Sequence, residues 1–334
     1  MSNHFPFQAC LSSAQINTWQ TFLQGKHKPL IVQAENPDGD SMASALALEE
    51  ALPGAKLYCP VETPKYLRYF EGWSRICTDF PDDIDSIIIV DTAAAALLTK
   101  LLDDPLIASK LRTLPVLIID HHETASTLDF AFSALIVPLS SCAALVFELL
   151  LATKATISKQ MAENLLYGLL SDTLGLTTPT TTADDFRRAG ALVDLGADVA
   201  AMEDRRRELS KKSVRILDYK ADLIKRVEYH LEGHLATVHI PFEEIQTFSD
   251  EYNPNVLILE ELRTVIDVDV AVAIKTYPDG KLTGKIRSTK PIAEKIAGYF
   301  GGGGHPYAAG FKVYEDYETV LKDLVSATDN LLML

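Results

Sequence analysis

The first half of the chain alternates short apolar runs with segments that have the spacing of helices. The apolar runs are "PLIVQA" (29–34), "AKLYCP" (55–60), "SIIIVDT" (86–92), "PVLIIDHH" (115–122) and "FSALIVP" (132–138). Between them, "MASALALEEAL", "AAALLTKLL" and "SCAALVFELLLA" repeat apolar residues at helical intervals. Strands that are apolar throughout and alternate with helices predict a parallel sheet covered on both faces. The predicted fold class is therefore α/β.

The pattern changes in the second half of the chain. A highly charged stretch over 199–222 predicts a helical connector. Partly solvated strands are then expected at "LIKRVEYH", "HLATVHIPF", "VDVAVAIKTY" and "KLTGKIRST", and helices at "IAEKIAGYF" and "YETVLKDLVSATDNLL". We therefore expect an N-terminal parallel-sheet domain over 1–198, the connector over 199–222, and a smaller α/β domain over 223–334. The length of 334 residues favours two domains over one.

Composition limits the partners that the protein can have. A net charge of -15 argues against affinity for long nucleic acid, because phosphate binding needs a basic surface. A small anionic substrate, held by a few cations, stays compatible with this charge. Four scattered cysteines without a CxxC pair are typical of free thiols in a reducing compartment. With no signal peptide and no apolar run of about 18 residues, we expect a cytoplasmic protein without a membrane partner.

Acidic residues and histidines follow several of the apolar runs. They are Asp38, Asp40, Asp91, Asp120, His121 and His122, with Asp172 after an apolar helix. Because ligands of parallel α/β sheets gather at the carboxyl ends of the strands, we expect these side chains to converge. A solvated turn or a helix cap can also explain a single aspartate. Two adjacent histidines at the end of a strand are harder to explain by packing, since a core prefers aliphatic side chains there.

Carboxylates and imidazoles without thiolates favour a borderline-hard divalent ion. Mn²⁺ suits this donor set better than Zn²⁺, and Mg²⁺ is the alternative. A carboxylate that bridges two ions about 3.5–4 Å apart is the usual arrangement for hydrolysis of phosphate esters. The residues by themselves therefore indicate a metal site with hydrolytic chemistry.

The ordered motifs "NPDGDS", "VDT", "IDHH" and "LLSDTLGL", followed by "GGGGHPYAAG", resemble the DHH phosphoesterase family with its DHH-associated C-terminal domain. Within that family the resemblance is to the bacterial oligoribonuclease and 3′-phosphoadenosine-5′-phosphate phosphatase (nano-RNase) branch, and it spans almost the whole chain. It implies a catalytic metal-binding domain over 1–198 and a substrate-binding domain over 223–334. It also implies hydrolysis of short oligonucleotides, of 3′-phosphoadenosine 5′-phosphate, or of both, by a metal-activated water.

The resemblance further implies a division of the metal ligands between two Mn²⁺ ions. Asp91 would bridge the ions and Asp38 would serve the first of them. The second ion would be held by Asp40, His121 and Asp172.

The remaining site residues implied by the resemblance act on the substrate. His122 would face the scissile phosphate, as a catalytic and substrate-binding residue, and Asp120 would support catalysis beside it. In the C-terminal domain the expected substrate-binding residues are Arg287, Ser288, Gly302, Gly303, Gly304 and His305. A guanidinium suits a phosphate oxyanion, and glycines let the backbone approach a ligand closely.

One position departs from the family pattern. Many relatives carry a metal-binding histidine two residues before the Asn-Pro-Asp of the first motif, and this chain has Ala34 there. We expect a weakened first metal site, helped by Asn36 or Glu35, beside a complete second site. Two alternatives follow: a phosphodiesterase for dinucleotides or other small nucleotides, and a nucleotide-binding sensor that does not cleave. The expected partner is a short single-stranded oligonucleotide or a small phosphorylated nucleotide, not a long duplex; a homodimer stays open.

Overall fold

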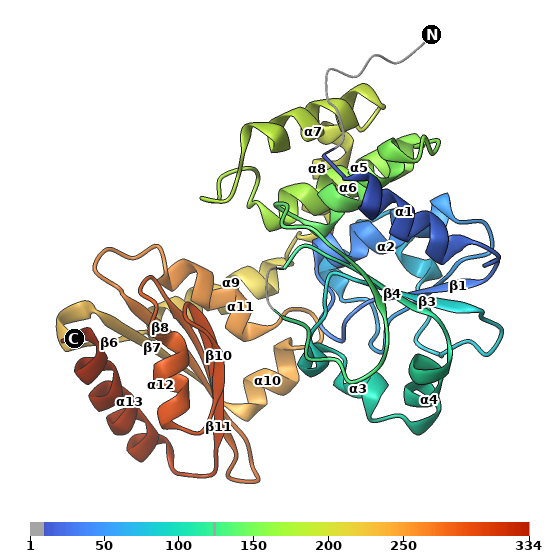
Figure 1. The fold of residues 1–334 in the computed structure, drawn as a ribbon. Coiled ribbons are helices and arrows are strands. Elements are labelled where there is room, and N and C mark those ends of the chain that lie inside the picture. The colour runs from blue at the N-terminus through green and yellow to red at the C-terminus, as the bar shows by residue number, and fades with distance from the viewer. Residues whose placement is uncertain (1–9, 123–124, 334) are drawn as a thin grey trace. The chain divides into compact units, whose positions relative to one another are not determined.

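The computed structural model describes residues 10–122 and 125–333. The chain divides into two compact units, residues 1–210 and 211–334 (Figure 1). The segment expected as one connector contains two helices, α8 (Val199–Leu209) in the first unit and α9 (Val214–Lys225) in the second. The two helices belong to different units because α8 buries Met202 in the first core, whereas α9 buries Ile216 in the second.

The first unit is built on a five-stranded sheet with the order β2-β1-β3-β4-β5. Its strands are β1 (Pro29–Val32), β2 (Lys56–Tyr58), β3 (Ser86–Val90), β4 (Val116–Asp120) and β5 (Ser133–Ile136). All neighbouring strands pair in parallel, which confirms the predicted α/β class with a parallel sheet. The direction of winding reverses between β1 and β3, and open α/β sheets bind ligands at such a switch point.

Helices cover both faces of this sheet (Figure 1). The helices of this unit before α8 are α1 (Ser13–Leu23), α2 (Gly39–Ala51), α3 (Thr99–Leu102), α4 (Pro105–Thr113), α5 (Cys142–Ala152), α6 (Lys159–Asp172) and α7 (Ala183–Asp194), of which α7 packs on α6. Short 3-10 turns lie at η1 (Lys65–Leu67), η2 (Trp73–Arg75) and η3 (Ala95–Leu97). The predicted helix "AAALLTKLL" is divided between η3 and α3, and α1 and α4 were not expected.

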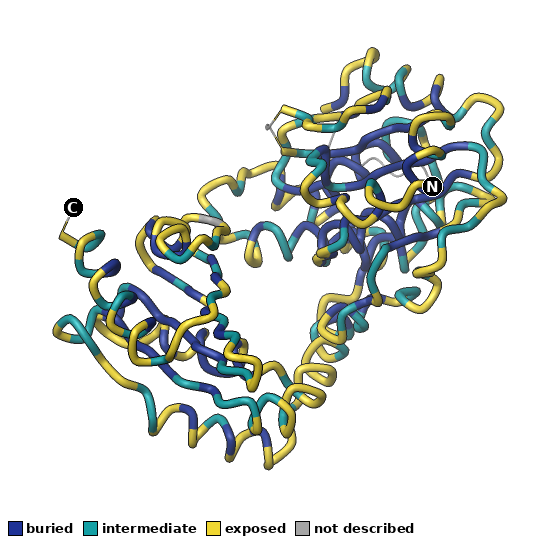
Figure 2. Tube along the Cα trace, turned by 90° about the horizontal axis from the view of Figure 1, so that it is seen from below, coloured by how far each residue is buried: buried dark blue, intermediate teal, exposed yellow. Residues whose placement is uncertain are grey.

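Alternate residues of each strand enter two different cores. In β3, Ile88 and Val90 pack with α1, α2, α5 and α6, whereas Ile87 and Ile89 pack with α3 and α4. Every residue of β1, β3 and β4 is buried, as the dark blue strands in Figure 2 show. The continuous apolar runs in the sequence therefore reflect a sheet that is shielded from water on both sides.

Helices α2, α5 and α6 approach one another closely at Gly168 of α6. A Cβ atom at Gly168 would lie 2.6 Å from the Cβ atoms of both Ala43 and Ala143. It would also lie 3.2 Å from Oδ1 of Asp40. The missing side chain lets the three helices pack around the buried Asp40 carboxylate.

The second unit contains a mixed six-stranded sheet with the order β10-β11-β9-β8-β7-β6. Its strands are β6 (Glu228–His230), β7 (Leu235–Ile240), β8 (Val270–Thr276), β9 (Leu282–Ser288), β10 (Gly303–His305) and β11 (Ala308–Val313). Its remaining helical segments are η4 (Leu231–Gly233), α10 (Phe242–Phe248), α11 (Pro254–Leu262), α12 (Ala293–Tyr299) and α13 (Tyr317–Leu332). Helices α12 and α13 pack on one face of the sheet, and α9 and α11 pack on the other.

Two segments of the second unit differ from the pattern expected from the sequence. The stretch "LIKRVEYH" is a strand only over Glu228–His230, because α9 continues to Lys225 and buries its apolar face in the core. The four-glycine segment is only partly a loop, since Gly303 and Gly304 belong to β10 and pair with β11. Among the helices of the described residues, none is long and apolar enough to cross a membrane.

The packing at Gly168 predicts a large effect of a small substitution. Gly168→Ala should lower the free energy of unfolding by about 1–3 kcal/mol, because the added methyl group overpacks the junction of three helices. Gly190 of α7 is the matched control, since a Cβ there meets nothing within 4 Å. Gly190→Ala should raise stability by about 0.5–1 kcal/mol, through helix propensity alone. Urea unfolding of both variants tests this, and equal effects would refute it.

Candidate metal centre

The acidic residues and histidines expected to form a site converge at the switch point of the first sheet. The loop after β1 carries Asp38 and begins α2, where Asp40 lies. Asp91 follows β3, and Asp120 is the last residue of β4. Asp172 is contributed by a different part of the unit, the last residue of α6.

His121 lies at the centre of this cluster. Its Nδ1 is 3.0 Å from the carbonyl oxygen of Leu139, which can only accept, so Nδ1 donates and the lone pair of a neutral ring lies on Nε2. Nε2 is 3.2 Å from Oδ2 of Asp172, 3.4 Å from Oδ1 of Asp91 and 3.8 Å from Oδ2 of Asp40. Within the described part of the chain, Nε2 has no hydrogen-bond partner. A lone pair that faces three carboxylates is repelled unless a cation lies between them.

The carboxylates of the cluster are held away from water. Asp40 is fully buried, and burial together with the charges of Asp91 and Asp172 raises its pKa well above the ordinary range. Burial, followed by the charges of Asp38 and Asp172, likewise raises the pKa of Asp91. Burial also raises the pKa of Asp172. A divalent cation would remove the repulsion that causes part of these shifts.

The geometry of the cluster fits metal ions. Two groups of three residues each offer ligand atoms that lie within 4.8 Å of one another inside the group. One group is Asp40, His121 and Asp172, and the other is Asp91, His121 and His122. Oδ1 of Asp91 and Nε2 of His121 are both buried without hydrogen-bond partners among the described residues. Oxygen and imidazole donors without sulfur suit Mn²⁺ or Mg²⁺. The group of Asp40, His121 and Asp172 contains the same residues that the family resemblance implies for the second ion.

Asp91 has an unusual backbone conformation. Its φ of 63° is left-handed, although it is not a glycine, and its N–H donates to the carbonyl oxygen of Ile119 at 2.8 Å. A non-glycine residue held in this region stores about 1–3 kcal/mol, and such strain concentrates at functional sites. The sheet therefore holds Asp91 in a strained turn directly beside His121.

Asp38 and Asp40 also hold helix termini. Oδ1 of Asp38 accepts the N–H groups of Asp40 at 3.1 Å and Ser41 at 2.9 Å, as the N-cap of α2. The carboxylate of Asp40 accepts the N–H groups of Cys142 at 2.6 Å and Ala143 at 2.8 Å, at the start of α5. Capping and metal binding are therefore compatible here, because each carboxylate keeps further lone pairs. Asp38 lies outside both groups of ligand atoms, so its role at the first ion stays a prediction.

Asp120 holds the two histidines that follow it. Its Oδ1 accepts the N–H groups of His121 at 2.8 Å and His122 at 3.2 Å. It also accepts Nδ1–H of His122 at 2.7 Å, which raises the pKa of His122. Burial acts to raise the pKa of Asp120, but the hydrogen bonds from His122 lower it overall. About half of the His122 side chain is exposed, so its Nε2–H is available to a ligand.

The segment around Ala34 provides few additional ligands. Ala34 is buried, and its carbonyl oxygen accepts from Sγ of Cys59 at 3.4 Å. Oε2 of Glu35 accepts the N–H of Lys100 at 3.0 Å, so this carboxylate already holds α3. Asn36 is exposed. Assistance from Asn36 or Glu35 at the first ion stays a prediction.

The residues expected to bind substrate in the second unit differ in their availability. Arg287 on β9 is partly exposed, whereas Ser288 is buried and its Oγ donates to the carbonyl oxygen of Asp269 at 2.9 Å. Gly302 precedes β10, where a Cβ would lie 2.3 Å from the carbonyl oxygen of Gly310. Gly303 and Gly304 belong to β10 itself. The side chain of His305 lies outside the described part of the structure.

Sequence reasoning missed two contributors to this centre. One is Leu139, whose carbonyl oxygen fixes the ring of His121; a backbone atom leaves no trace in the residue type. The other is Gly168, which lets α6 approach Asp40. A glycine inside the apolar helical stretch "LLYGLL" was a readable signal of close helix packing.

The fold and the site together define an α/β protein with a cluster of carboxylates and histidines, a candidate metal centre, at the switch point of a parallel sheet. The model of the DHH family, N-terminal domain, matches residues 28–169, and that of the DHHA1 domain matches residues 245–333. Together the two models match more than half of the chain, and the chain belongs to the DHH family. This membership confirms the predicted class of enzyme, a phosphoesterase.

Named relatives agree with this membership. The chain is 27% identical over 300 residues to the bifunctional oligoribonuclease and PAP phosphatase NrnA of Thermus thermophilus, covering 86% of each chain. It is 30% identical over 184 residues to a probable manganese-dependent inorganic pyrophosphatase of Streptococcus equi subsp. equi, covering 50% of this chain and 55% of that protein. The crystal structure of an exopolyphosphatase-related protein from Bacteroides fragilis has the same fold, with a TM-score of 0.83 at 21% identity over 97% of this chain and 98% of that one.

The raised pKa of Asp91 predicts a pH-dependent stability of the metal-free protein. Because the folded state holds this proton more tightly than the unfolded state, Asp91 contributes stability at low pH that is lost as the pH rises through its raised pKa. Asp91→Asn cannot ionise and tolerates the left-handed backbone. With a chelator present, the free energy of unfolding of this variant should rise relative to that of the wild type as the pH rises. The difference should reach about 1 kcal/mol or more near neutrality.

The measurement is urea unfolding between pH 4 and pH 8, with and without Mn²⁺. Added Mn²⁺ should raise the free energy of unfolding of the wild type more than that of Asp91→Asn, because the variant lacks the carboxylate proposed to serve both ions. The exposed Asp194 provides the control. The stability of Asp194→Asn should follow that of the wild type at every pH, and Mn²⁺ should stabilise it as much as the wild type. Parallel pH curves for wild type and Asp91→Asn would contradict the electrostatic argument.

Proposed function

We propose that this protein hydrolyses short single-stranded oligonucleotides, 3′-phosphoadenosine 5′-phosphate, or both, with divalent ions held in the metal centre. The observation that carries the proposal is the unpartnered Nε2 of His121 among the carboxylates of Asp40, Asp91 and Asp172. Divalent cations between these groups would compensate the negative charge, and two-metal sites of carboxylates and histidines hydrolyse phosphate esters.

Two further observations support the substrate and the metal. The name of the Thermus thermophilus relative gives oligoribonuclease and PAP phosphatase activities, and that of the Streptococcus equi relative gives manganese dependence. The net charge of -15 disfavours a long duplex, because the protein lacks the overall basic charge that tracks many phosphates. A short substrate presents few phosphates and therefore needs few cations.

The proposed ligands divide between two ions. Asp40, His121 and Asp172 would hold the second ion, and Asp91 would bridge from it to the first ion beside Asp38. When bound, Mn²⁺ or Mg²⁺ supplies a water of lowered pKa and neutralises charge on the phosphate. Leu139 keeps His121 in the tautomer that presents a lone pair to the ions.

The chain's own donors stabilise the phosphate. Asp120 orients His122 and raises its pKa, so that the ring keeps a proton to donate to a non-bridging phosphate oxygen as negative charge develops there. Asp120 thus acts as a positioning residue. In the second unit, the planar guanidinium of Arg287 suits a phosphate group of the substrate, and Gly302, Gly303 and Gly304 allow close approach of a ligand to the backbone.

A direct assay tests this function. Purified protein with Mn²⁺ is incubated with a labelled dinucleotide, with 3′-phosphoadenosine 5′-phosphate and with a long duplex. We expect turnover of one or both small substrates and none of the duplex. Asp91→Ala should reduce turnover by several orders of magnitude, because one carboxylate is proposed to serve both ions, whereas Asp194→Ala should retain it. Binding of nucleotide without turnover would overturn the proposal in favour of a sensor.

The position of Ala34 provides a gain-of-function test. Ala34→His should lower the Mn²⁺ concentration for half-maximal turnover by roughly tenfold, equivalent to about 1.4 kcal/mol of binding, because an imidazole would be added to the first ion. Ala34→Ser, which adds a polar group without a strong ligand, serves as the control and should leave the Mn²⁺ requirement unchanged. An unchanged or higher requirement in Ala34→His would show that this position does not reach the first ion.

A further inference from the structure

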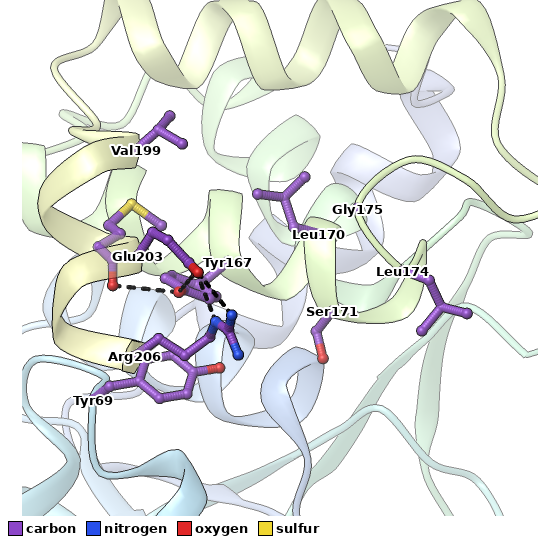
Figure 3. Close-up of a pocket in the computed structure, with 10 residues that line it drawn as sticks. Tyr69, Tyr167, Leu170, Ser171, Leu174, Gly175, Val199, Glu203 and Arg206 are labelled. Atoms are coloured by element: carbon purple, nitrogen blue, oxygen red, sulfur yellow. Dashed lines mark hydrogen bonds and ion pairs between the residues drawn. The ribbon is translucent and has the colours of Figure 1, made fainter. Parts of the chain in front are cut away.

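The first unit contains a cavity of about 430 Å³ that the metal centre does not use (Figure 3). Part of its lining is the end of α6, with Leu170 and Ser171, and part is the turn that follows, with Leu174 and Gly175. These residues lie on either side of Asp172 in the chain, and Asp172 is one of the candidate metal ligands. The turn is strained as well, since Leu174 has a φ of 49°. The cavity and the metal centre therefore share one turn of the chain.

A second contact joins the cavity to the metal centre. A Cβ atom at Gly39 would lie 2.5 Å from Oγ of Ser171, so Ser171 packs against the loop that carries Asp38 and Asp40. A ligand with its phosphate at the carboxylates would thus have this cavity directly beside it. The volume of about 430 Å³ lies within the range of small-molecule sites.

The wall of the cavity is aromatic and apolar. The ring centroids of Tyr69 and Tyr167 are 4.6 Å apart. Leu174 is 73% exposed and Val199 48% exposed, so apolar side chains lie open to solvent at a cavity where a monomer would ordinarily cover them. Aromatic and aliphatic walls of this kind suit the flat face of a heteroaromatic ring, which gains stacking and dispersion contacts.

A charged pair provides polar recognition in the same cavity. Arg206 binds Glu203 through Nε and Nη2, both at 2.7 Å, which leaves Nη1 outside this ion pair. The hydrogen bond from Arg206 lowers the pKa of Glu203 to about 2, so the carboxylate stays ionised and holds the guanidinium in place. Its two oxygens already accept from Arg206, Arg207 and the Tyr167 hydroxyl. The Tyr167 hydroxyl lies 3.3 Å from the carbonyl oxygen of Met202 and 3.4 Å from Oε2 of Glu203, and it donates to these acceptors, which fixes the tyrosine in the cavity wall. Figure 3 shows Arg206 close to both tyrosines. The Nη1 group of Arg206, which lines the cavity, can donate to an acceptor atom at the edge of a nucleobase.

We propose that this cavity binds the nucleobase of a nucleotide whose phosphate lies at the metal centre. The proposal rests on the proposed function, to which it adds a specificity subsite formed by Tyr69, Tyr167, Val199 and Arg206. The base stacks on the aromatic wall, and its edge meets the Arg206–Glu203 pair. The subsite would make the enzyme prefer phosphates that carry a base over phosphates that carry only a sugar.

The test compares ligands with and without a base. Adenosine 5′-monophosphate and ribose 5-phosphate are titrated calorimetrically into the full chain with Mn²⁺. The wild type should bind the nucleotide roughly tenfold more tightly, the size expected for a base stacked on an aromatic side chain. Val199→Trp, which fills the cavity from its exposed rim, should abolish this preference and should raise KM for a dinucleotide roughly tenfold with little change in kcat.

Val214 provides a matched control. Like Val199, it is the first residue of a helix and is exposed, but it belongs to the second unit and lies outside the cavity lining. Val214→Trp should keep both the nucleotide preference and KM. If Val199→Trp unfolds at a lower temperature than the wild type, Val199→Phe is used in its place.

The outcomes separate this proposal from the proposed function. Turnover of a dinucleotide with an unchanged nucleotide preference in Val199→Trp overturns the subsite and leaves the function intact. A base preference that Val199→Trp removes, in a protein that hydrolyses neither small substrate, supports the subsite and overturns the function. Equal affinity of the wild type for the two titrated ligands also overturns the subsite.

Discussion

The buried carboxylate of Asp40 is the interaction on which the first unit depends. It accepts two N–H groups at the start of α5, and Gly168 of α6 leaves the space in which it fits. The same carboxylate lies 3.8 Å from Nε2 of His121. A charge without solvent is tolerated only when donors or cations surround it. Asp40 therefore ties the packing of three helices to the chemistry of the site.

The carboxylates of the cluster differ in the groups that surround them. Backbone amides at two helix N-termini hold the carboxylates of Asp38 and Asp40. Oxygens of Asp40, Asp91 and Asp172 face Nε2 of His121. The negative charges of Asp40, Asp91 and Asp172 repel one another, and a divalent cation between them would remove this repulsion. Asp120 differs from the other carboxylates, because its Oδ1 accepts the backbone N–H of His121 and the ring Nδ1–H of His122, and, against the effect of burial, the hydrogen bonds from His122 lower its pKa. Asp120 orients His122, and its charge also contributes to the raised pKa of Asp91.

Much of this arrangement was predictable from the sequence. Continuous apolar runs required a sheet buried on both faces, and the acidic residues after those runs had to meet at its carboxyl edge. What the sequence concealed depends on contacts between distant segments. The contact of His121 with the Leu139 carbonyl, and the double role of Asp40 as ligand candidate and helix partner, involve backbone atoms that any residue could supply. The extent of α9 and the pairing of Gly303 in a strand were likewise decided by packing that local propensity does not record.

The sequence by itself determined the α/β class, the order of motifs and the donor chemistry, because period, residue type and spacing are local properties. Only the tertiary structure decided which carboxylates face His121, how Asp91 turns into a left-handed conformation, and where the Tyr69–Tyr167 cavity lies. These features arise where elements far apart in the chain pack together. Their geometry is therefore set by helix and sheet packing, which no single stretch of residues contains.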